Sequence, residues 1–499
     1  MAQKNSIKSF DNEKYLLEQS EEILKQVNKY EKLYLEFGGK LIFDYHASRV
    51  LPGFDPNVKM RLLQKLKHRA DILICVYSGD IERRKIRADF GITYEADVFK
   101  LISDLKQWGL EVSGVVITRF ENQPTVKIFK NKLERRGLKV YTHYYTKGYP
   151  TDVDLIVSPQ GYGANDYIET QKQIVVVTGP GPCSGKLATC LSQLYQDHEK
   201  GIKSGYAKFE TFPVWNIPLK HPLNMAYEAA TADLGDINMI DSFHLDAYGE
   251  KTVNYNRDME IFPVISRILG RIMGSDDVYK SPTDMGVNKV KSGIVNDQEV
   301  VEASKQEIIR RYFRYQCEYI LGLIDNDTLE RTNLLMKELN INEDYRSVVI
   351  PARKVIENSG EEANPFGAAI ELPDGHIIAK KGNDLLSAVS CLILDSVKYL
   401  AKIPDEINLL PTNITQAIRD LKKNFIKKDK SVLTLEEVLI ALGISAVTNP
   451  TSELAMSKLG ELRGCEVHTT RVPSSEDEIG LRNLEVNLTS DSLFSLHEN

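Results

Sequence analysis

The first half of the chain repeats one pattern, in which a short apolar run is followed by a polar or glycine-rich turn and then by a segment with helical spacing. Near-continuous apolar runs are typical of parallel strands that are covered on both faces, and they occur at residues 71–77, 114–118 and 174–178. The segments between them carry apolar residues three and four positions apart, which predicts amphipathic helices. Strands that alternate with helices predict a doubly wound, mainly parallel α/β sheet.

Further elements follow from weaker patterns in the same half. One polar-rich amphipathic helix is expected over residues 12–36, followed by a short strand at 40–46. Additional strands are expected at 140–145, 154–158 and near 206–215, and helices at 57–69, 93–108, 124–136 and from residue 186 onward. In such sheets ligands bind beyond the carboxyl ends of the strands, where this chain repeatedly places polar residues.

The second half begins with a long helical pattern and then returns to strands. Residues 297–340 look helical throughout, and Arg310, Arg311 and Arg314 are expected on a solvated face, the alternative being contact with anions. From residue 346, strands are expected at 347–352, 366–372, 376–380, 465–472 and near 484–488, and helices at 384–402, 412–424, 434–442 and 451–462. The patterns predict an α/β domain at 1–234, a mainly helical middle section at 235–345 and a C-terminal α/β domain at 346–499.

The clearest chemical signal is the turn after the apolar run 174–178, which reads Thr178-Gly-Pro-Gly-Pro-Cys-Ser-Gly-Lys186. Its glycines allow a tight turn in which backbone N–H groups converge, and the start of the following helix adds partial positive charge. Lys186 adds a full positive charge at the same place. The residues predicted to bind phosphate or another anion are Gly179, Gly181, Ser184, Gly185 and Lys186.

This turn is P-loop-like but departs from the P-loop pattern twice. The first glycine of that pattern falls at Pro180, and the hydroxyl that coordinates magnesium falls at Leu187. The cofactor is therefore left open: a nucleotide fits the turn, whereas magnesium dependence is disfavoured. The alternative is a glycine-rich turn that only packs a helix onto the sheet.

Two short constellations are candidates for acid–base chemistry. Asp44 and His46 lie at the end of the strand expected at 40–46, and His244 and Asp246 also lie two residues apart, so on a strand each pair would share a face. Either pair could transfer protons or hold a metal, and the alternative is a pair of hydrogen-bonded structural groups. Cys183 is a further candidate, because a helix N-terminus lowers the pKa of a thiol; its alternative is a packing role.

Composition narrows the class of protein. The chain has 499 residues, is 42% hydrophobic and 27% charged, and carries a net charge of −7, which argues against a general binder of nucleic acid or anionic membranes. Residues 1–13 contain no apolar signal core, and no run approaches the roughly 18 apolar residues of a membrane span. Six cysteines without paired spacing argue against disulfides and structural zinc. We expect a cytoplasmic protein with a small anionic ligand and no nucleic-acid or membrane partner; a homo-oligomer stays open.

Three stretches together resemble a bacterial family of about this length that carries only a "domain of unknown function" label. They are Phe37-Gly-Gly-Lys-Leu-Ile-Phe-Asp-Tyr-His-Ala-Ser-Arg-Val-Leu-Pro-Gly-Phe-Asp55, the turn Thr178–Lys186, and Leu484-Glu-Val-Asn-Leu-Thr489. The resemblance runs from end to end and implies the architecture and a cytosolic protein, but no catalytic residues. Some members of the family are labelled ATP-dependent peptidases.

Three functions remain in competition. The first is an enzyme that acts on a phosphorylated small molecule or a nucleotide, with phosphate at the turn and proton transfer by one of the two pairs. The second is a nucleotide-sensing or regulatory protein that uses the same turn without chemistry. A peptidase is the weakest, because neither a Gly-x-Ser-x-Gly nor a His-Glu-x-x-His motif is present.

Overall fold

The computed structural model describes residues 9–87, 91–275, 278–357, 366–426 and 432–494. The chain forms two compact units, an N-terminal unit of residues 7–228 and 236–304 and a C-terminal unit of residues 229–235 and 305–499. The predicted middle section, 235–345, is divided between these two units after residue 304. Among the described residues, no helix combines the length and apolarity that crossing a bilayer requires.

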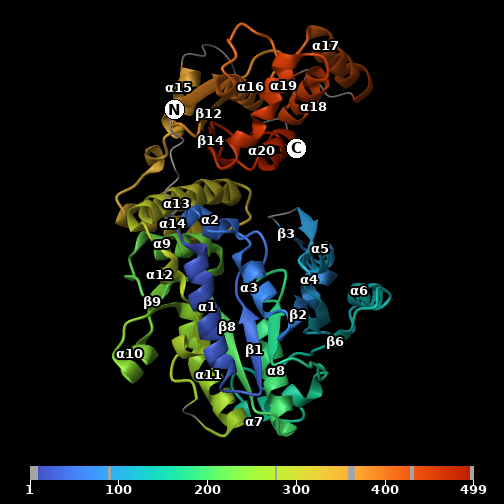
Figure 1. Cartoon of the computed structure of the whole chain (residues 1–499), viewed down its shortest axis with the longest axis vertical. Coiled ribbons are helices and arrows are strands. Elements are labelled where there is room, and N and C mark those ends of the chain that lie inside the picture. The colour runs from blue at the N-terminus through green and yellow to red at the C-terminus, as the bar shows by residue number, and fades with distance from the viewer. Residues whose placement is uncertain (1–8, 88–90, 276–277, 358–365, 427–431, 495–499) are drawn as a thin grey trace. The chain divides into compact units, whose positions relative to one another are not determined.

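The core of the N-terminal unit is a seven-stranded sheet in the order β11–β8–β1–β7–β2–β5–β6 (Figure 1). All of its strand pairings are parallel, which confirms the predicted doubly wound α/β class. The strands are β1 Lys32–Phe37, β2 Ala70–Tyr77, β5 Val112–Thr118, β6 Val140–Thr142, β7 Ile174–Thr178, β8 Ser204–Phe209 and β11 Gly286–Val287. Every residue of β7 is buried, as expected for an uninterrupted apolar run at the centre of a parallel sheet.

Helices and short hairpin strands surround this sheet. They are α1 Asn12–Val27, α2 Tyr45–Val50, α3 Val58–Leu66, α4 Ser78–Glu82, β3 Ile86–Arg87, β4 Ile92–Thr93, α5 Tyr94–Gln107, α6 Pro124–Glu134, α7 Val153–Ile156, α8 Lys186–Glu199, α9 Pro222–Ala230, β9 Asn238–Ile240, α10 Ser242–Tyr248, β10 Val253–Tyr255, α11 Asn256–Met273 and α12 Val290–Gly293. The glycine-rich turn therefore joins β7 to α8, as predicted.

The helix predicted over 12–36 is confirmed only for its first 16 residues, and the strand predicted at 40–46 is wrong. The helix ends at Val27, and β1 begins five residues later. Lys32 and Glu36 interrupt the apolar pattern of β1, yet both are buried because partners distant in sequence satisfy them. The Glu36 carboxylate accepts a hydrogen bond of 2.8 Å from the Tyr206 hydroxyl, and the Lys32 ammonium lies 3.5 Å from the Asp197 carboxylate.

The strand predicted at 154–158 is also wrong, because this segment forms the single helical turn α7. The Asp152 carboxylate accepts a hydrogen bond of 3.0 Å from the Leu155 amide and caps that turn. An N-terminal cap of this kind stabilises a helical turn by about 1 kcal/mol, which outweighs the weak strand preference of a short apolar run.

The C-terminal unit contains a four-stranded sheet in the order β13–β12–β14–β15. Strand β12 pairs antiparallel with β13 and β14, whereas β14 and β15 are parallel. Its strands are β12 Gly367–Glu371, β13 Ile377–Lys381, β14 Glu466–Thr469 and β15 Asn487–Ser490. Its helices are the part of α13 Asp297–Ile320 from residue 305, α14 Asn326–Glu338, α15 Val349–Glu357, α16 Ala388–Ala401, α17 Thr412–Leu421, α18 Leu435–Ala446, α19 Pro450–Ser457 and α20 Ser475–Asn483. A separate C-terminal α/β fold is thus confirmed.

One strand predicted in this unit, 347–352, is instead the start of helix α15. Val348 and Ala352 lie four residues apart and pack against Ala369 of β12, which is helical spacing rather than strand alternation. Pro351 stands in the first turn, where a helix tolerates proline.

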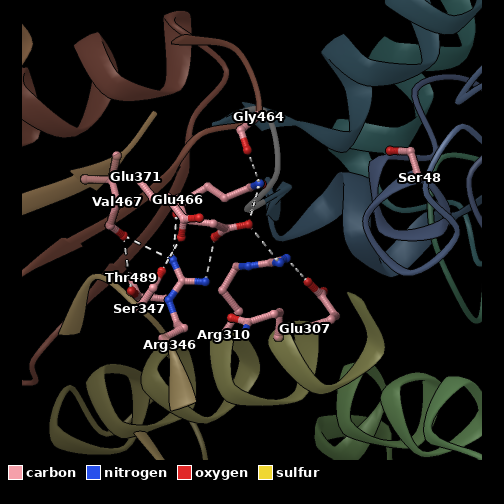
Figure 2. Close-up of polar contacts among 12 residues, drawn as sticks. Ser48, Glu307, Arg310, Arg346, Ser347, Glu371, Gly464, Glu466, Val467 and Thr489 are labelled. Atoms are coloured by element: carbon pink, nitrogen blue, oxygen red, sulfur yellow. Dashed lines mark hydrogen bonds and ion pairs between the residues drawn. The ribbon is translucent and has the colours of Figure 1, made fainter. Parts of the chain in front are cut away.

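Buried charges join α13 and Arg346, which lies three residues before α15, to this sheet (Figure 2). The fully buried Arg346 guanidinium donates hydrogen bonds of 2.6 Å to the Glu466 carboxylate, 3.2 Å to the Val467 carbonyl and 3.0 Å to the Asn487 carbonyl. Figure 2 also shows Arg310 between the carboxylates of Glu307 and Glu466.

The solvated face predicted for the arginines of this helix is therefore wrong for two of them. The side chains of Arg310 and Arg311 are only 10% and 16% exposed, because both pair with the buried Glu307 carboxylate.

Candidate functional site

The glycine-rich turn has a backbone that only glycine fits at its last position. Gly185 is the N-cap of α8 and has a left-handed φ of +87°. A Cβ atom at Gly185 would lie 2.8 Å from the Thr118 side chain, so any other residue would clash as well as strain the backbone. Cys183, which is exposed, also has a left-handed φ of +55°. The turn is therefore held in a defined conformation.

The first turn of α8 presents unused hydrogen-bond donors. The N–H groups of Lys186, Leu187 and Ala188 have no carbonyl one turn earlier within the helix. No side chain of the described residues caps them. The Lys186 ammonium lies 3.5 Å from both the Gly181 carbonyl and the Ser184 hydroxyl, at the outer limit of hydrogen bonding, so it folds over the turn. Amide donors and a cation thus gather at one helix start, an arrangement that favours anions.

A second cation comes from the end of β5. The Arg119 guanidinium stacks over the Tyr77 ring, 3.8 Å from its centroid, and donates to the Cys183 carbonyl. The neighbouring Thr118 hydroxyl donates a hydrogen bond of 2.8 Å to the Ser184 carbonyl. The ends of β2 and β5 therefore support the turn from one side and place Arg119 against it.

The polar side chain that ends β7 is buried next to the start of this turn in the sequence. Thr178 is fully buried, and within the described part of the chain its hydroxyl has no hydrogen-bond partner. Buried hydroxyls are normally satisfied by protein, water or ligand. The Ser184 side chain is buried against Gly179, where a Cβ atom would lie 2.6 Å from the Ser184 Oγ. Ser184 therefore fills the inner part of the bend, and an anion would meet its outer side.

The turn also lies at a switch point of the sheet. Strands β1 and β7 are neighbours, and their pairing reaches Glu36 and Val177, so the segments that follow leave at the same level. Tyr34 of β1 reaches Asp197 of α8 on one face of the sheet. Phe37 stacks on Phe209 on the other face, where Lys59 of α3 lies 5.9 Å from the Phe209 ring. The chain thus leaves β1 and β7 toward opposite faces, which is the position where open α/β sheets bind ligands.

Asp44 lies on the β1 side of this edge, where its carboxylate is already engaged. It accepts hydrogen bonds of 3.0 Å from the Lys59 ammonium and 3.3 Å from the Ala47 amide, and it caps α2. Burial opposes ionisation of Asp44, but the charges of Lys59 and His46 hold its pKa below the ordinary value. The His46 ring meets the edge of the Phe212 ring at 5.6 Å. The structure therefore brings Asp44 and His46 together beside the loop that follows β1.

The second predicted pair does not share a face. His244 and Asp246 lie on helix α10, where two positions differ by about 200° around the axis, so the strand assumption was wrong. Asp241 caps this helix by accepting a hydrogen bond of 2.9 Å from the His244 amide. The buried His244 ring contacts the Ser281 hydroxyl at 2.9 Å, whereas Asp246 is exposed.

Pattern reading missed a charged cluster at the end of β8. The Lys208 ammonium lies 2.6 Å from the Glu210 carboxylate and 2.5 Å from the Asp258 carboxylate, which belongs to the first turn of α11. The signal in the sequence was a pair of charged residues two positions apart, Lys208 and Glu210, at the end of an apolar and aromatic run. Their partner, Asp258, is 50 residues away from Lys208 and could not be paired with it by spacing.

Comparisons with known proteins agree on one family and name no activity. Residues 8–340 match the model "Domain of unknown function DUF1846, N-terminal", and residues 344–498 match the corresponding C-terminal model. A "UPF0371 protein" of Clostridium botulinum (strain ATCC 19397 / Type A) is 58% identical over 486 residues, which is 97% of each chain. A protein of the same name from Clostridium tetani (strain Massachusetts / E88) is 57% identical over 486 residues, which is again 97% of each chain.

Proposed function

Because the chain belongs to the DUF1846 family, whose description assigns no function, we propose from the geometry of the site that it binds a phosphate-containing small molecule or nucleotide at the 179–186 turn. The residues proposed to hold the phosphate are Gly179, Gly181, Ser184, Gly185 and Lys186, of which Ser184 would contribute its backbone amide, because its side chain is buried in the bend. The structure adds Arg119 as a neighbour of the turn.

The observation that carries this proposal is the uncapped start of α8 next to two cations. The 14-residue helix directs its free first-turn amides toward the turn, and Lys186 and Arg119 stand on it. A hydrogen bond to a charged group contributes about 1.5–3 kcal/mol, and a helix terminus about 0.3–1 kcal/mol. Two such bonds, about 3–6 kcal/mol together, correspond to a dissociation constant between about 6 mM and 0.04 mM.

The residue that follows Lys186 bears on whether the site uses magnesium. Leu187 occupies the position at which a P-loop supplies its magnesium ligand, so the turn offers amides and cations but no hydroxyl for the metal there. We propose that anion binding does not require magnesium. The likeness to a P-loop itself stays a prediction.

Two forms of the proposal differ in chemistry. In the enzymatic form, Asp44 or His46 transfers a proton to or from the bound ligand; His244 and Asp246 stay weaker predictions, since they do not share a face. In the sensing form, the turn binds a nucleotide without turnover. The commitment of the Asp44 carboxylate to Lys59 favours His46 over Asp44 as the proton-transferring group. A peptidase gains no support from these residues.

The test is calorimetric titration with inorganic phosphate, nucleotides and phosphosugars, with and without magnesium. Lys186→Ala should lower the affinity for every phosphate ligand about 10- to 100-fold, since it removes one charge-assisted contact. Lys139→Ala is the matched control, because that side chain is 63% exposed and remote in sequence from the turn. Equal affinities of the wild type and Lys186→Ala for all ligands would refute the site.

Turnover separates the two forms. Each compound that binds is incubated with the protein for a long period and followed by phosphorus NMR. A new resonance that Lys186→Ala does not produce supports an enzyme, whereas tight binding without product supports a sensor.

A further inference from the structure

The cluster at the end of β8 consists of one ammonium group between several acceptors. The Lys208 ammonium contacts Glu210 at 2.6 Å, Asp258 at 2.5 Å and the Tyr255 hydroxyl at 2.5 Å. These contacts use all three N–H donors of a lysine. With both carboxylates ionised, they and the ammonium group carry a net charge of −1 in a largely buried place.

The cluster is short of hydrogen-bond donors. An ionised carboxylate offers about four acceptor sites, so Glu210 and Asp258 together offer roughly eight, and Lys208 fills two of them. Burial, together with the neighbouring charge of Asp258, raises the pKa of Glu210 to about 7 although Lys208 opposes the shift. A carboxyl group that retains its proton near neutral pH is one whose charged form lacks stabilising donors. The Asp258 side chain is 22% exposed, so solvent reaches the cluster.

The cluster and the anion-binding turn lie at the same edge of the sheet. Strand β1 stands between β7 and β8, and the Gly38 amide donates a hydrogen bond of 3.0 Å to the Phe209 carbonyl at the level where all three strands end. Two strand spacings of about 4.8 Å separate β7 from β8, so the strand ends that lead into the turn and the cluster lie roughly 10 Å apart. A single ligand of ordinary metabolite size spans that distance.

We propose that the ligand of this edge is a phosphorylated polyol of the sugar-phosphate class, whose phosphate binds the turn and whose hydroxyl groups donate to Glu210 and Asp258. This inference rests on the proposed phosphate site. Neutral hydroxyls fit the cluster because they supply donors without adding charge, whereas a ligand ammonium would meet repulsion from Lys208. A nucleobase presents acceptors beside its donors, and those acceptors would face carboxylates.

The experiment compares inorganic phosphate with hexose, pentose and inositol monophosphates, aminoalkyl phosphates and nucleoside monophosphates by calorimetry. At least one polyol phosphate should bind the wild-type protein about 10-fold more tightly than inorganic phosphate, as one added charge-assisted hydrogen bond implies. Glu210→Gln should abolish this gain while leaving the affinity for inorganic phosphate within about 2-fold. Lys186→Ala should lower the affinity for inorganic phosphate and for the polyol phosphates.

Several outcomes would overturn the inference. If the wild type binds inorganic phosphate but no polyol phosphate more tightly, the inference fails and the phosphate site stands. The same holds if nucleotides or aminoalkyl phosphates bind most tightly, or if the gain survives in Glu210→Gln. If inorganic phosphate and all its esters fail to bind the wild type, the phosphate site fails too.

Two controls protect the test against misfolding. Glu169→Gln alters a side chain that is 79% exposed. It should change neither the affinity for inorganic phosphate nor that for polyol phosphates. If circular dichroism shows that Glu210→Gln does not fold, Asp258→Asn replaces it, because that variant removes the other acceptor and should also reduce the gain for polyol phosphates.

Discussion

Replacing Arg346 by methionine should destabilise the C-terminal unit by about 3–4 kcal/mol. The substitution keeps an apolar stem but removes three hydrogen bonds, of 2.6, 3.2 and 3.0 Å, from a side chain that is fully buried. Removing one partner of a buried ion pair costs about 3–5 kcal/mol, because the remaining charge is left without compensation. The lower part of that range applies here, since Glu466 keeps Asn487 at 3.0 Å and Arg310 at 3.5 Å.

The cost should depend on pH in a defined direction. Burial alone would raise the pKa of Glu466, but Arg310 and Arg346 hold it below the ordinary value. The folded state therefore gains stability from this group above the unfolded pKa of about 4.5, and loses it as the pH falls through the folded pKa. In Arg346→Met the Glu466 pKa rises, so the two proteins should converge in stability as the carboxyl group becomes protonated.

The assay must report on the C-terminal unit alone. Both tryptophans, Trp108 and Trp215, belong to the N-terminal unit, so their fluorescence serves as an internal control. Hydrogen exchange of the β14 amides follows the affected sheet, and a loss of 3–4 kcal/mol corresponds to roughly 100- to 1,000-fold faster exchange.

A double-mutant cycle isolates the ion pair. Glu466→Met alone leaves the Arg346 charge unpaired, whereas Arg346→Met with Glu466→Met removes both charges and should cost clearly less than the sum of the single variants. Exchange in Arg346→Met that stays within about 3-fold of the wild type, or strict additivity in the cycle, would refute the reasoning.

Two further predictions concern the N-terminal unit. Burial lowers the pKa of His143 to about 4; the folded state keeps it neutral while the unfolded state binds a proton below pH 6.5, so stability should fall by up to about 3 kcal/mol between pH 6.5 and 4. Urea denaturation followed by tryptophan fluorescence should show a smaller pH dependence in His143→Gln, and an unchanged one would contradict this assignment. Gly185→Ala should cost more stability than Gly201→Ala, by about 1–3 kcal/mol, because both have a positive φ but only Gly185 has a side chain, that of Thr118, in the space of the new Cβ. Equal costs would mean that the Thr118 contact relaxes freely.

The residues that sequence reading placed correctly are those whose surroundings are encoded locally. Strands β2 and β7 are near-continuous apolar runs, and such runs indicate burial on both faces without knowledge of the partner. The turn after β7 combines glycines with a lysine at a helix start, and each of these signals acts within a few residues. The α/β class and the position of the glycine-rich turn between β7 and α8 could therefore be predicted from the chain itself.

Strand β1 escaped prediction because its polar residues are satisfied at long range. Glu36 is bonded to Tyr206 and Lys32 lies beside Asp197, at separations of 170 and 165 residues. Without those partners a lysine and a glutamate in a six-residue segment indicate a solvated face. Helix α10 shows the opposite case, since the cap formed by Asp241 is local, but the spacing of His244 and Asp246 was interpreted for a strand.

The sequence alone determined the class of the fold and the glycine-rich turn proposed to bind an anion, because periodicity and turn chemistry act between neighbouring residues. Only the tertiary structure decided which charges surround that turn. Arg119 reaches it from β5, and Lys208, Glu210 and Asp258 gather at the end of β8 from two separate elements. Side chains that meet across a parallel sheet are joined by long crossovers, so no spacing along the chain records their contact.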